Sequence, residues 1–244
     1  MTIPELRSQL TGLIEGTPFA GKTYLVGGAV RDHLMGLGDI SDFDLTVELP
    51  GGGIRLARVL HKSLPPDSLR INQHFGTARL DFPGYAIDLN GTRKERYQKN
   101  SRFPRVSPGS LMDDIMRRDF TVNALLMEIF SGDILDLCGK GLADLEGGII
   151  RTLRDPLTVL SEDPLRILRA IRFAVRLDFS ICPELMEALT TSAPLVKTLS
   201  KSRKLQELKL MQEQPDFDRA EQYLELLGIR GELLRGEMGT FGTR

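Results

Sequence analysis

Two aspartates separated by a single residue are the side chains in this sequence best placed to carry chemistry. Asp42 and Asp44 open an apolar run, DFDLTV, whose alternation predicts a β-strand. Alternate residues of a strand point to the same side, so both carboxylates should project from one face. Two converging carboxylates suit a divalent metal ion and the nucleoside triphosphate bound to it. The sequence leaves open the alternative that both aspartates only cap a turn.

A glycine pair precedes these aspartates. Gly27 and Gly28 follow the apolar residues 24–26 and lead into residues 29–35, which have helical character. A strand that is followed by a glycine pair and then by the start of a helix brings free backbone N–H groups and the positive end of the helix together. This arrangement predicts a phosphate site next to the two carboxylates.

A third carboxylate, Asp88, lies near the end of another predicted strand, residues 85–89. If its strand neighbours that of Asp42 and Asp44, the three form one acidic cluster. Such a cluster requires cations, and hard oxygen ligands favour Mg²⁺, two of which could activate a hydroxyl and stabilise a pyrophosphate leaving group. The alternative for Asp88 is a surface aspartate at the end of a strand.

The segment MDDIMRRDFTVNALL, residues 112–126, is predicted as part of a helix covering residues 111–126. Arg117 and Arg118 could reach phosphate or ribose, and Asp119 and Asn123 would share one helix face. A charged, solvated helix start with its apolar residues packed inward explains the same periodicity equally well.

A further segment, SEDPLRILRAIRFAVRL, combines an expected helix cap with an arginine stripe. Asp163 before Pro164 fits an N-cap followed by proline at the first helical position. Arg166, Arg169 and Arg172 recur every three residues, whereas a solvated face usually mixes lysine and glutamate. The stripe indicates ligand recognition, although a plain amphipathic helix is an equal alternative.

The elements that position these residues fall into two halves. Residues 1–150 should form an α+β domain and residues 151–244 an all-helical one, with the change near residues 151–155, beyond which strand patterns disappear. In the first half we expect helices at residues 4–15 and 54–64, strands at 69–73, 77–82 and 85–89, and a hairpin of residues 127–130 and 133–137. In the second half we expect helices at residues 164–177, 183–190, 201–214 and 217–227.

Residues 91–109 are polar, basic and interrupted by prolines, which predicts a long, partly mobile loop. From residue 88 to residue 118 there are eight Lys or Arg against four Asp or Glu, so a positive patch is expected. The whole chain has a formal net charge of −1, which argues against a protein that coats nucleic acid through bulk charge.

Composition restricts the remaining classes. The 244 residues are 41% hydrophobic and 27% charged, an ordinary composition for a soluble protein. Two cysteines far apart predict free thiols in a reducing compartment, and three scattered histidines argue against a zinc site or a Ser-His triad. No run approaches the ~20 apolar residues of a membrane span and no signal peptide is visible, so we expect a cytoplasmic protein without a membrane partner.

Several of these segments together resemble one family. LVGGAVRDHLMG, DFDLTV, RRDFTVNALL, GLADLEGGIIRTL, LSEDPLRILRAIRFA and, more weakly, LSKSRKLQELKLM occur in that order between residues 24 and 211. They resemble the bacterial-type (class II) tRNA nucleotidyltransferases and poly(A) polymerases, within the DNA polymerase β-like nucleotidyltransferase superfamily. The resemblance implies a nucleotidyltransferase head of mixed sheet and flanking helices, followed by a helical neck and the start of an RNA-binding body. Family members usually carry further helical domains, so the chain is expected to be a truncated, catalytic part.

The resemblance also implies roles for individual residues. Asp42 and Asp44 match the metal-binding pair, and Asp88 takes the place of the third carboxylate, although AIDLNGTR around it departs from the common family pattern. The positions implied in nucleotide binding are Gly27, Gly28, Arg31 and Asp32 for the triphosphate, Arg118, Asp119 and Asn123 for ribose and phosphates, and Asp163 and Arg166 for the base, with Arg169 and Arg172 extending the stripe.

The implied function is template-independent addition of C, A or both (CCA, CC or A) to the 3′ end of tRNA, from CTP and ATP with Mg²⁺ as cofactor and release of pyrophosphate. The motifs do not separate this enzyme from a poly(A) polymerase acting on other RNA ends. A nucleotide- or RNA-binding fragment without turnover is the alternative from another class. The sequence does not determine the oligomeric state.

Overall fold

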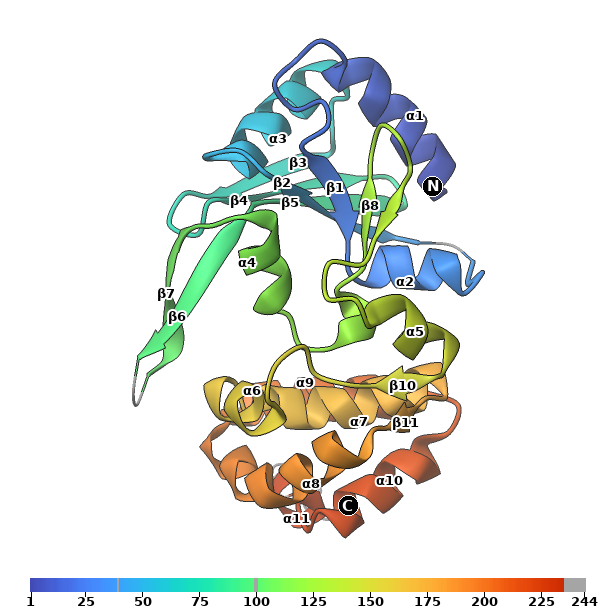
Figure 1. Ribbon diagram of the computed structural model, residues 1–244, viewed down its shortest axis with the longest axis vertical. Helices are drawn as coiled ribbons and strands as arrows, with labels where there is room; N and C mark the ends of the chain where they lie inside the picture. The colour runs from blue at the N-terminus through green and yellow to red at the C-terminus, as the bar shows by residue number, and fades with distance from the viewer. Residues whose placement is uncertain (39, 99–100, 235–244) are drawn as a thin grey trace, which may run out of the picture. The chain divides into compact units, whose positions relative to one another are not determined.

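A computed structural model describes residues 1–38, 40–98 and 101–234 of the chain, and two compact units can be distinguished in it (Figure 1). The first covers Met1–Leu142 and the second begins at Ala143. The first is a mixed α+β unit and the second is mainly helical, which confirms the predicted fold class. The predicted domain boundary at residue 150 lies after the helix α5 (Gly141–Glu146), whereas the division between the compact units falls inside that helix.

The first unit is built on a mixed sheet, which has seven strands within the described residues. The strand order is β3-β4-β5-β2-β1-β8-β9, and only β2 and β5 pair in parallel. The strands are β1 (Thr23–Val26), β2 (Asp42–Val47), β3 (Ser68–Asn72), β4 (Thr77–Phe82), β5 (Tyr85–Gly91), β8 (Leu126–Glu128) and β9 (Ile134–Leu135). A turn between Phe82 and Tyr85 joins β4 to β5, which lie close to the strands predicted over residues 77–82 and 85–89.

Helices α1 (Ile3–Ile14) and α3 (Gly52–Ser63) cover one face of this sheet (Figure 1). Thr2 and Glu5 form a reciprocal capping box that satisfies free N–H groups at the start of α1. Helix α3 approaches the sheet so closely that a Cβ at Gly53 would lie 2.8 Å from the backbone oxygen of Leu89. A larger residue at position 53 would therefore push the helix away from β5.

The predicted helix over residues 111–126 is wrong in its second half. Helix α4 (Leu111–Met116) ends early, and the chain continues through a 3₁₀ turn (Thr121–Asn123) into β8. The side chain of Asp119 accepts the backbone N–H of Phe120 at 2.8 Å, an interaction that competes with helical hydrogen bonding. Residues 119–127 are all buried, whereas a helix on the surface of a sheet buries only one side.

The predicted mobile loop over residues 91–109 is also wrong. Strands β6 (Arg93–Gln98) and β7 (Ser101–Pro108) pair antiparallel in a separate two-stranded sheet. Each strand of such a ribbon keeps one unpaired edge, where charged residues and proline are tolerated. Polar composition therefore did not exclude strands here. Figure 1 shows the ribbon extending away from the main sheet of its unit.

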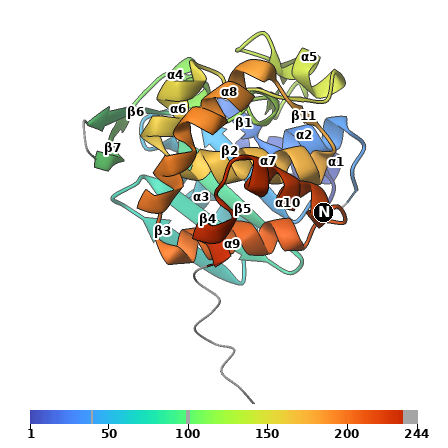
Figure 2. The same cartoon turned by 90° about the horizontal axis from the view of Figure 1, so that it is seen from below.

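In the second unit, α7 (Leu165–Leu177) packs against α9 (Lys201–Gln212) and α10 (Phe217–Leu226) (Figure 2). The other elements are α6 (Pro156–Glu162), α8 (Pro183–Ser192), a 3₁₀ helix (Ala193–Thr198) and α11 (Arg230–Leu234). The expectation that strands end at residue 150 is wrong, because β10 (Ile149–Ile150) pairs in parallel with β11 (Ser180–Ile181). None of the helices in the described part of the chain has the length and apolar character that crossing a membrane requires.

Candidate active site

Three carboxylates lie on two adjacent strands of the first unit. Phe43 and Leu45 are buried, so Asp42 and Asp44 between them face the opposite, accessible side of β2. The parallel pairing of β2 with β5 places Asp88 directly opposite Asp44. The two strands are therefore neighbours, which is the condition that the sequence set for one acidic cluster, whereas the role of the three carboxylates as metal ligands stays a prediction.

Arg79 binds two of these carboxylates and was not identified from the sequence. It lies on β4, directly opposite Asp88. Its guanidinium donates from Nη1 to Asp88 at 2.5 Å, from Nη2 to Asp42 at 2.8 Å and from Nε to Asp81 at 2.9 Å. The hydrogen bond to Asp42 is the main cause that raises the pKa of Arg79, so its positive charge is firmly kept. Counting three residues outward from the Phe82–Tyr85 turn would have placed Arg79 opposite Asp88.

The carboxylate of Asp44 is desolvated by the protein around it. The residue is open to solvent on one side, but the protein around its other sides desolvates it, and this raises the pKa of its carboxyl group. The positive charge of Arg118 lowers that pKa, while the negative charges of Asp88 and Asp42 raise it. Three like charges close together thus leave Asp44 in need of a further cation.

Gly27 and Arg118 line the space beside Asp44. Gly27 has φ +75°, and a Cβ there would lie 3.3 Å from Nη1 of Arg118 and 3.9 Å from Oδ2 of Asp44. Nη2 of Arg118 donates to Asp114 at 3.2 Å, but its buried Nε has no hydrogen-bond partner within the described residues. A buried N–H group without a partner is costly. The Arg118 side chain as a whole is 17% exposed, so its accessible part can contact an anionic ligand.

Other residues predicted to bind nucleotide form a buried network in the same unit. Arg31 is only 1% exposed, donates to Asp32 at 2.7 Å and also donates to the side-chain oxygen of Asn123. The amide of Asn123 in turn donates to Asp119 at 3.1 Å. These contacts fix the orientation of the Asn123 side chain. In this structure the buried Arg31 therefore positions Asn123. Gly28 lies close enough that a Cβ there would be 3.4 Å from Arg31.

The predicted base-reading pair belongs to the second unit. Helix α7 begins at Leu165, one residue later than predicted, and Asp163 accepts the N–H of Leu165 at 3.2 Å. Both carboxylate oxygens of Asp163 also lie 3.3 Å from Nη2 of Arg203. The buried Arg166 donates to the backbone oxygen of Val159 at 3.2 Å, so its guanidinium is held in one direction.

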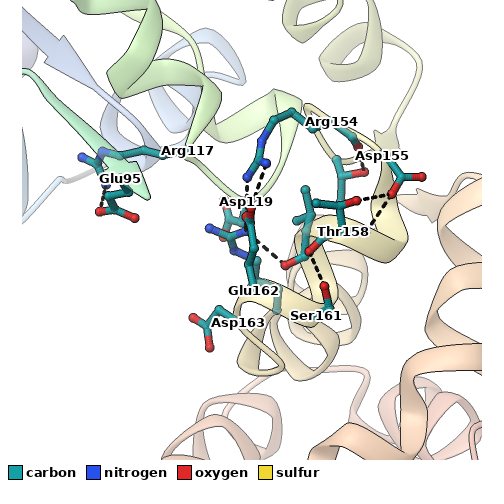
Figure 3. Close-up of polar contacts among 12 residues, drawn as sticks. Glu95, Arg117, Asp119, Arg154, Asp155, Thr158, Ser161, Glu162 and Asp163 are labelled. Atoms are coloured by element: carbon teal, nitrogen blue, oxygen red, sulfur yellow. Dashed lines mark hydrogen bonds and ion pairs between the residues drawn. The ribbon is translucent and has the colours of Figure 1, made fainter. Parts of the chain in front are cut away.

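Neighbouring polar contacts stabilise the segment before α7, as Figure 3 shows. Arg154 donates to Glu162 at 3.0 Å, and Glu162 also lies 3.6 Å from Arg166. Asp155 accepts the backbone N–H of Thr158 at 2.8 Å and so caps α6. Helix α6 was not predicted, although an aspartate followed by proline is a recognisable helix start.

The remaining arginines of the predicted stripe have internal contacts. The buried Arg172 donates to the buried Glu207 of α9 at 2.7 Å and lies 4.4 Å from the ring centroid of Phe173. Arg169 lies 5.1 Å from the same ring. Arg172 therefore connects α7 to α9 through its contact with Glu207. Its predicted role in nucleotide binding stays untested.

The donor chemistry of the carboxylate cluster fits Mg²⁺, because three carboxylates on adjacent strands provide hard oxygen ligands. Within the residues that the structure describes, no group of three or more histidine, cysteine, aspartate or glutamate side chains is arranged to hold a metal ion. In this structure Arg79 instead holds oxygens of both Asp42 and Asp88.

Comparison with known proteins identifies relatives of both units. The chain is 36% identical over 217 residues to the A-adding tRNA nucleotidyltransferase of Aquifex aeolicus, covering 85% of this chain and 24% of that protein. It is 33% identical over 216 residues to poly(A) polymerase I of Salmonella typhi, covering 84% of this chain and 45% of that protein. Among solved structures, a tRNA nucleotidyltransferase complexed with a primer tRNA and an incoming ATP analog superimposes with a TM-score of 0.75 at 29% identity.

That superposition covers 96% of this chain and 62% of the solved one, so the chain spans less than two thirds of each of these relatives. The family described as the poly A polymerase head domain matches residues 23–151, slightly more than half of the 244 residues. The matched segment contains the three carboxylates, the glycine pair and the Arg118–Asn123 region. This protein therefore belongs to the poly A polymerase head domain family.

Proposed function

We propose that the protein is a template-independent RNA nucleotidyltransferase that adds C, A or both to the 3′ end of tRNA, using CTP and ATP. The observation that carries this proposal is the placement of Asp42, Asp44 and Asp88 on adjacent strands, with Gly27 and the guanidinium of Arg118 beside Asp44. The first group suits a metal ion and the second a phosphate, which together suit a metal-bound nucleoside triphosphate. The A-adding relative and the tRNA-bound structure support tRNA as the substrate.

In the proposed reaction, the 3′-hydroxyl oxygen of the RNA attacks the α-phosphorus of the nucleotide, and pyrophosphate leaves. Asp42, Asp44 and Asp88 would hold Mg²⁺, which would supply a lower pKa for the hydroxyl and compensation of the charge on the leaving group. Arg118 holds the phosphates through the accessible part of its side chain, and Gly27 leaves room for them because it has no side chain. Arg31 keeps Asn123 oriented toward the sugar and phosphates.

Choice of the base is assigned to Asp163 and Arg166. Cytosine and adenine both present an exocyclic amino donor beside a ring-nitrogen acceptor, which an aspartate acceptor and an arginine donor match. Uracil and guanine reverse this pattern, and each buried polar group left unpaired costs about 1–3 kcal/mol. The hydrogen bond from Arg166 to the oxygen of Val159 supports this role, since it restricts the direction of the guanidinium.

The test is incubation of the purified chain with tRNA that lacks its 3′ end, with each nucleotide separately and Mg²⁺, followed by sequencing of the products. We expect incorporation of C, A or both, and its loss in Asp42→Ala and Asp44→Ala at an unchanged circular dichroism spectrum. Asp67→Ala, at an exposed aspartate of the same unit, should keep full activity. Full activity in either cluster variant would contradict the assignment of the carboxylates.

A poly(A) polymerase acting on other RNA ends is the second candidate, favoured by the similarity to the Salmonella typhi enzyme. The two candidates differ in substrate and in product length. Long adenosine tails on an unstructured RNA would favour the polymerase, whereas addition that stops after one to three nucleotides on tRNA would favour the first proposal.

A further inference from the structure

Arg79 occupies the position where a cation is needed in the carboxylate cluster. Its two terminal nitrogens reach Asp88 at 2.5 Å on the neighbouring strand β5 and Asp42 at 2.8 Å on β2, the next strand along. Its planar guanidinium presents several fixed donors, so one side chain can bridge two carboxylates as a metal ion would. The register of the β4–β5 hairpin places Arg79 there, because it lies directly opposite Asp88.

The same contacts conflict with metal binding. Mg²⁺ and Mn²⁺ need the oxygens of these carboxylates as ligands, and a guanidinium among them both occupies the oxygens and repels a second cation. The side chain of Arg79 is 32% exposed, and that of Asp42 is 62% exposed. The contact is therefore open to solvent, where ion pairs are weak enough to exchange.

We propose that Arg79 is an internal counter-ion of the cluster, which is displaced from Asp42 and Asp88 when a divalent metal ion binds. This inference rests on the proposed function, because it takes the cluster as the metal site. The bond from Nε of Arg79 to Asp81 at 2.9 Å provides an anchor outside the cluster, on the same strand. The arginine lowers the affinity for metal and stabilises the cluster in its absence, so Arg79 is a positioning residue.

The test is a titration with Mn²⁺ alone, without nucleotide or RNA, in which free Mn²⁺ is followed by electron paramagnetic resonance. Arg79→Ala should bind Mn²⁺ about three- to tenfold more tightly than the wild type, because two solvent-exposed ion pairs no longer compete. The Mn²⁺ affinity of Arg79→Lys should lie between those of the wild type and Arg79→Ala, since lysine keeps the charge but cannot bridge both carboxylates with a planar fork. Adding Asp44→Ala to Arg79→Ala should abolish the tight site.

Arg70→Ala is the matched control. Arg70 is 68% exposed and pairs with Asp81 at 2.9 Å. Its removal deletes the same charge beside the same anchor and should leave the affinity for Mn²⁺ unchanged. If Arg79→Ala fails to fold, the inference is tested by comparing the Mn²⁺ affinity of Arg79→Lys with that of the wild type and of Arg70→Ala.

The outcomes separate this inference from the proposed function. Binding of Mn²⁺ by the wild type with equal or weaker binding by the Arg79 variants overturns the inference and leaves the metal site intact. An equal gain in Arg70→Ala also overturns it, because the effect would then be one of general charge. Absence of binding in both the wild type and Arg79→Ala overturns the inference and the metal site together.

A second measurement is the melting temperature with and without Mn²⁺. Without metal, Arg79→Ala should melt below the wild type, because the carboxylates lose their counter-ion. Addition of Mn²⁺ should raise its melting temperature by more than that of the wild type. An equal or smaller rise would contradict the displacement.

Discussion

At the scale of single residues, the cluster contains one carboxylate whose charge is poorly compensated. Desolvation raises the pKa of Asp44, and the negative charges of Asp88 and Asp42 add to this effect. A raised pKa means that the folded protein binds this proton more tightly than the unfolded chain does. The stability that results is fully present below the unfolded pKa of about 3.9 and is lost as pH rises through the folded pKa.

We therefore expect Asp44→Asn to stabilise the metal-free protein at neutral pH, since the neutral amide avoids both repulsion and desolvation. The melting temperature should rise by roughly 2–4 °C at pH 7, and the gain should shrink toward pH 4, where the wild-type carboxyl is increasingly protonated. Thermal unfolding at both pH values, with EDTA present, measures this difference. If the wild type and Asp44→Asn had the same melting temperature at pH 7, the claim that the charge of Asp44 destabilises the metal-free protein would be contradicted.

The pair Asp42 and Asp44 could be predicted from the sequence because a strand period of two suffices to put them on one face. Arg79 required more, namely the register of β4 against β5 and the adjacency of β5 to β2. The second of these pairings joins strands far apart in the chain. Nothing local to residue 79 reports that pairing, on which the contact with Asp42 depends, whereas the position of Arg79 opposite Asp88 follows from the register of the hairpin alone.

At the scale of elements, the stripe on α7 illustrates how one periodicity serves two purposes. Arg166 and Arg172 are both buried, but Arg172 faces Glu207 of α9. Sequence periodicity locates a stripe on a helix and does not report what packs against it. The break after α4 has a similar cause, since the burial of residues 119–127 depends on the sheet that surrounds them.

The buried pair of Arg172 and Glu207 gives a prediction on the packing of α7 against α9. Glu207→Ala should destabilise the protein by about 3–5 kcal/mol, because it leaves an unpaired buried arginine. The double variant Arg172→Met and Glu207→Leu should recover most of that loss, since apolar residues of similar volume replace the pair. Urea unfolding of the wild type and the variants measures both effects.

The same double variant tests whether Arg172 contacts the nucleotide. If its role is confined to packing, the double variant should bind ATP and CTP as the wild type does. A loss of nucleotide affinity at recovered stability would instead assign Arg172 to the binding site, as the stripe predicted.

At the scale of the whole molecule, the chain combines two units with different tasks in the proposed reaction. The first carries the carboxylates and the phosphate-binding residues, and the second carries the pair assigned to the base. The division into an α+β part and a helical part could be predicted, because the alternation typical of strands is lost over many residues. A wrong assignment of one short element does not change that pattern. The short strands β10 and β11 were missed because two residues are too few to establish a period.

The last prediction concerns selection of the nucleotide. Arg166→Ala should reduce the preference for C and A over U and G by about five- to a hundredfold, because one buried hydrogen bond worth about 1–3 kcal/mol no longer discriminates. Rates of single-nucleotide incorporation with each of the four triphosphates measure this ratio. Arg176→Ala, at an exposed position near the end of the same helix, is the matched control and should keep the wild-type preference. An unchanged preference in Arg166→Ala at normal folding would remove the base-reading assignment, whereas equal loss for all four nucleotides would place Arg166 in phosphate binding or packing.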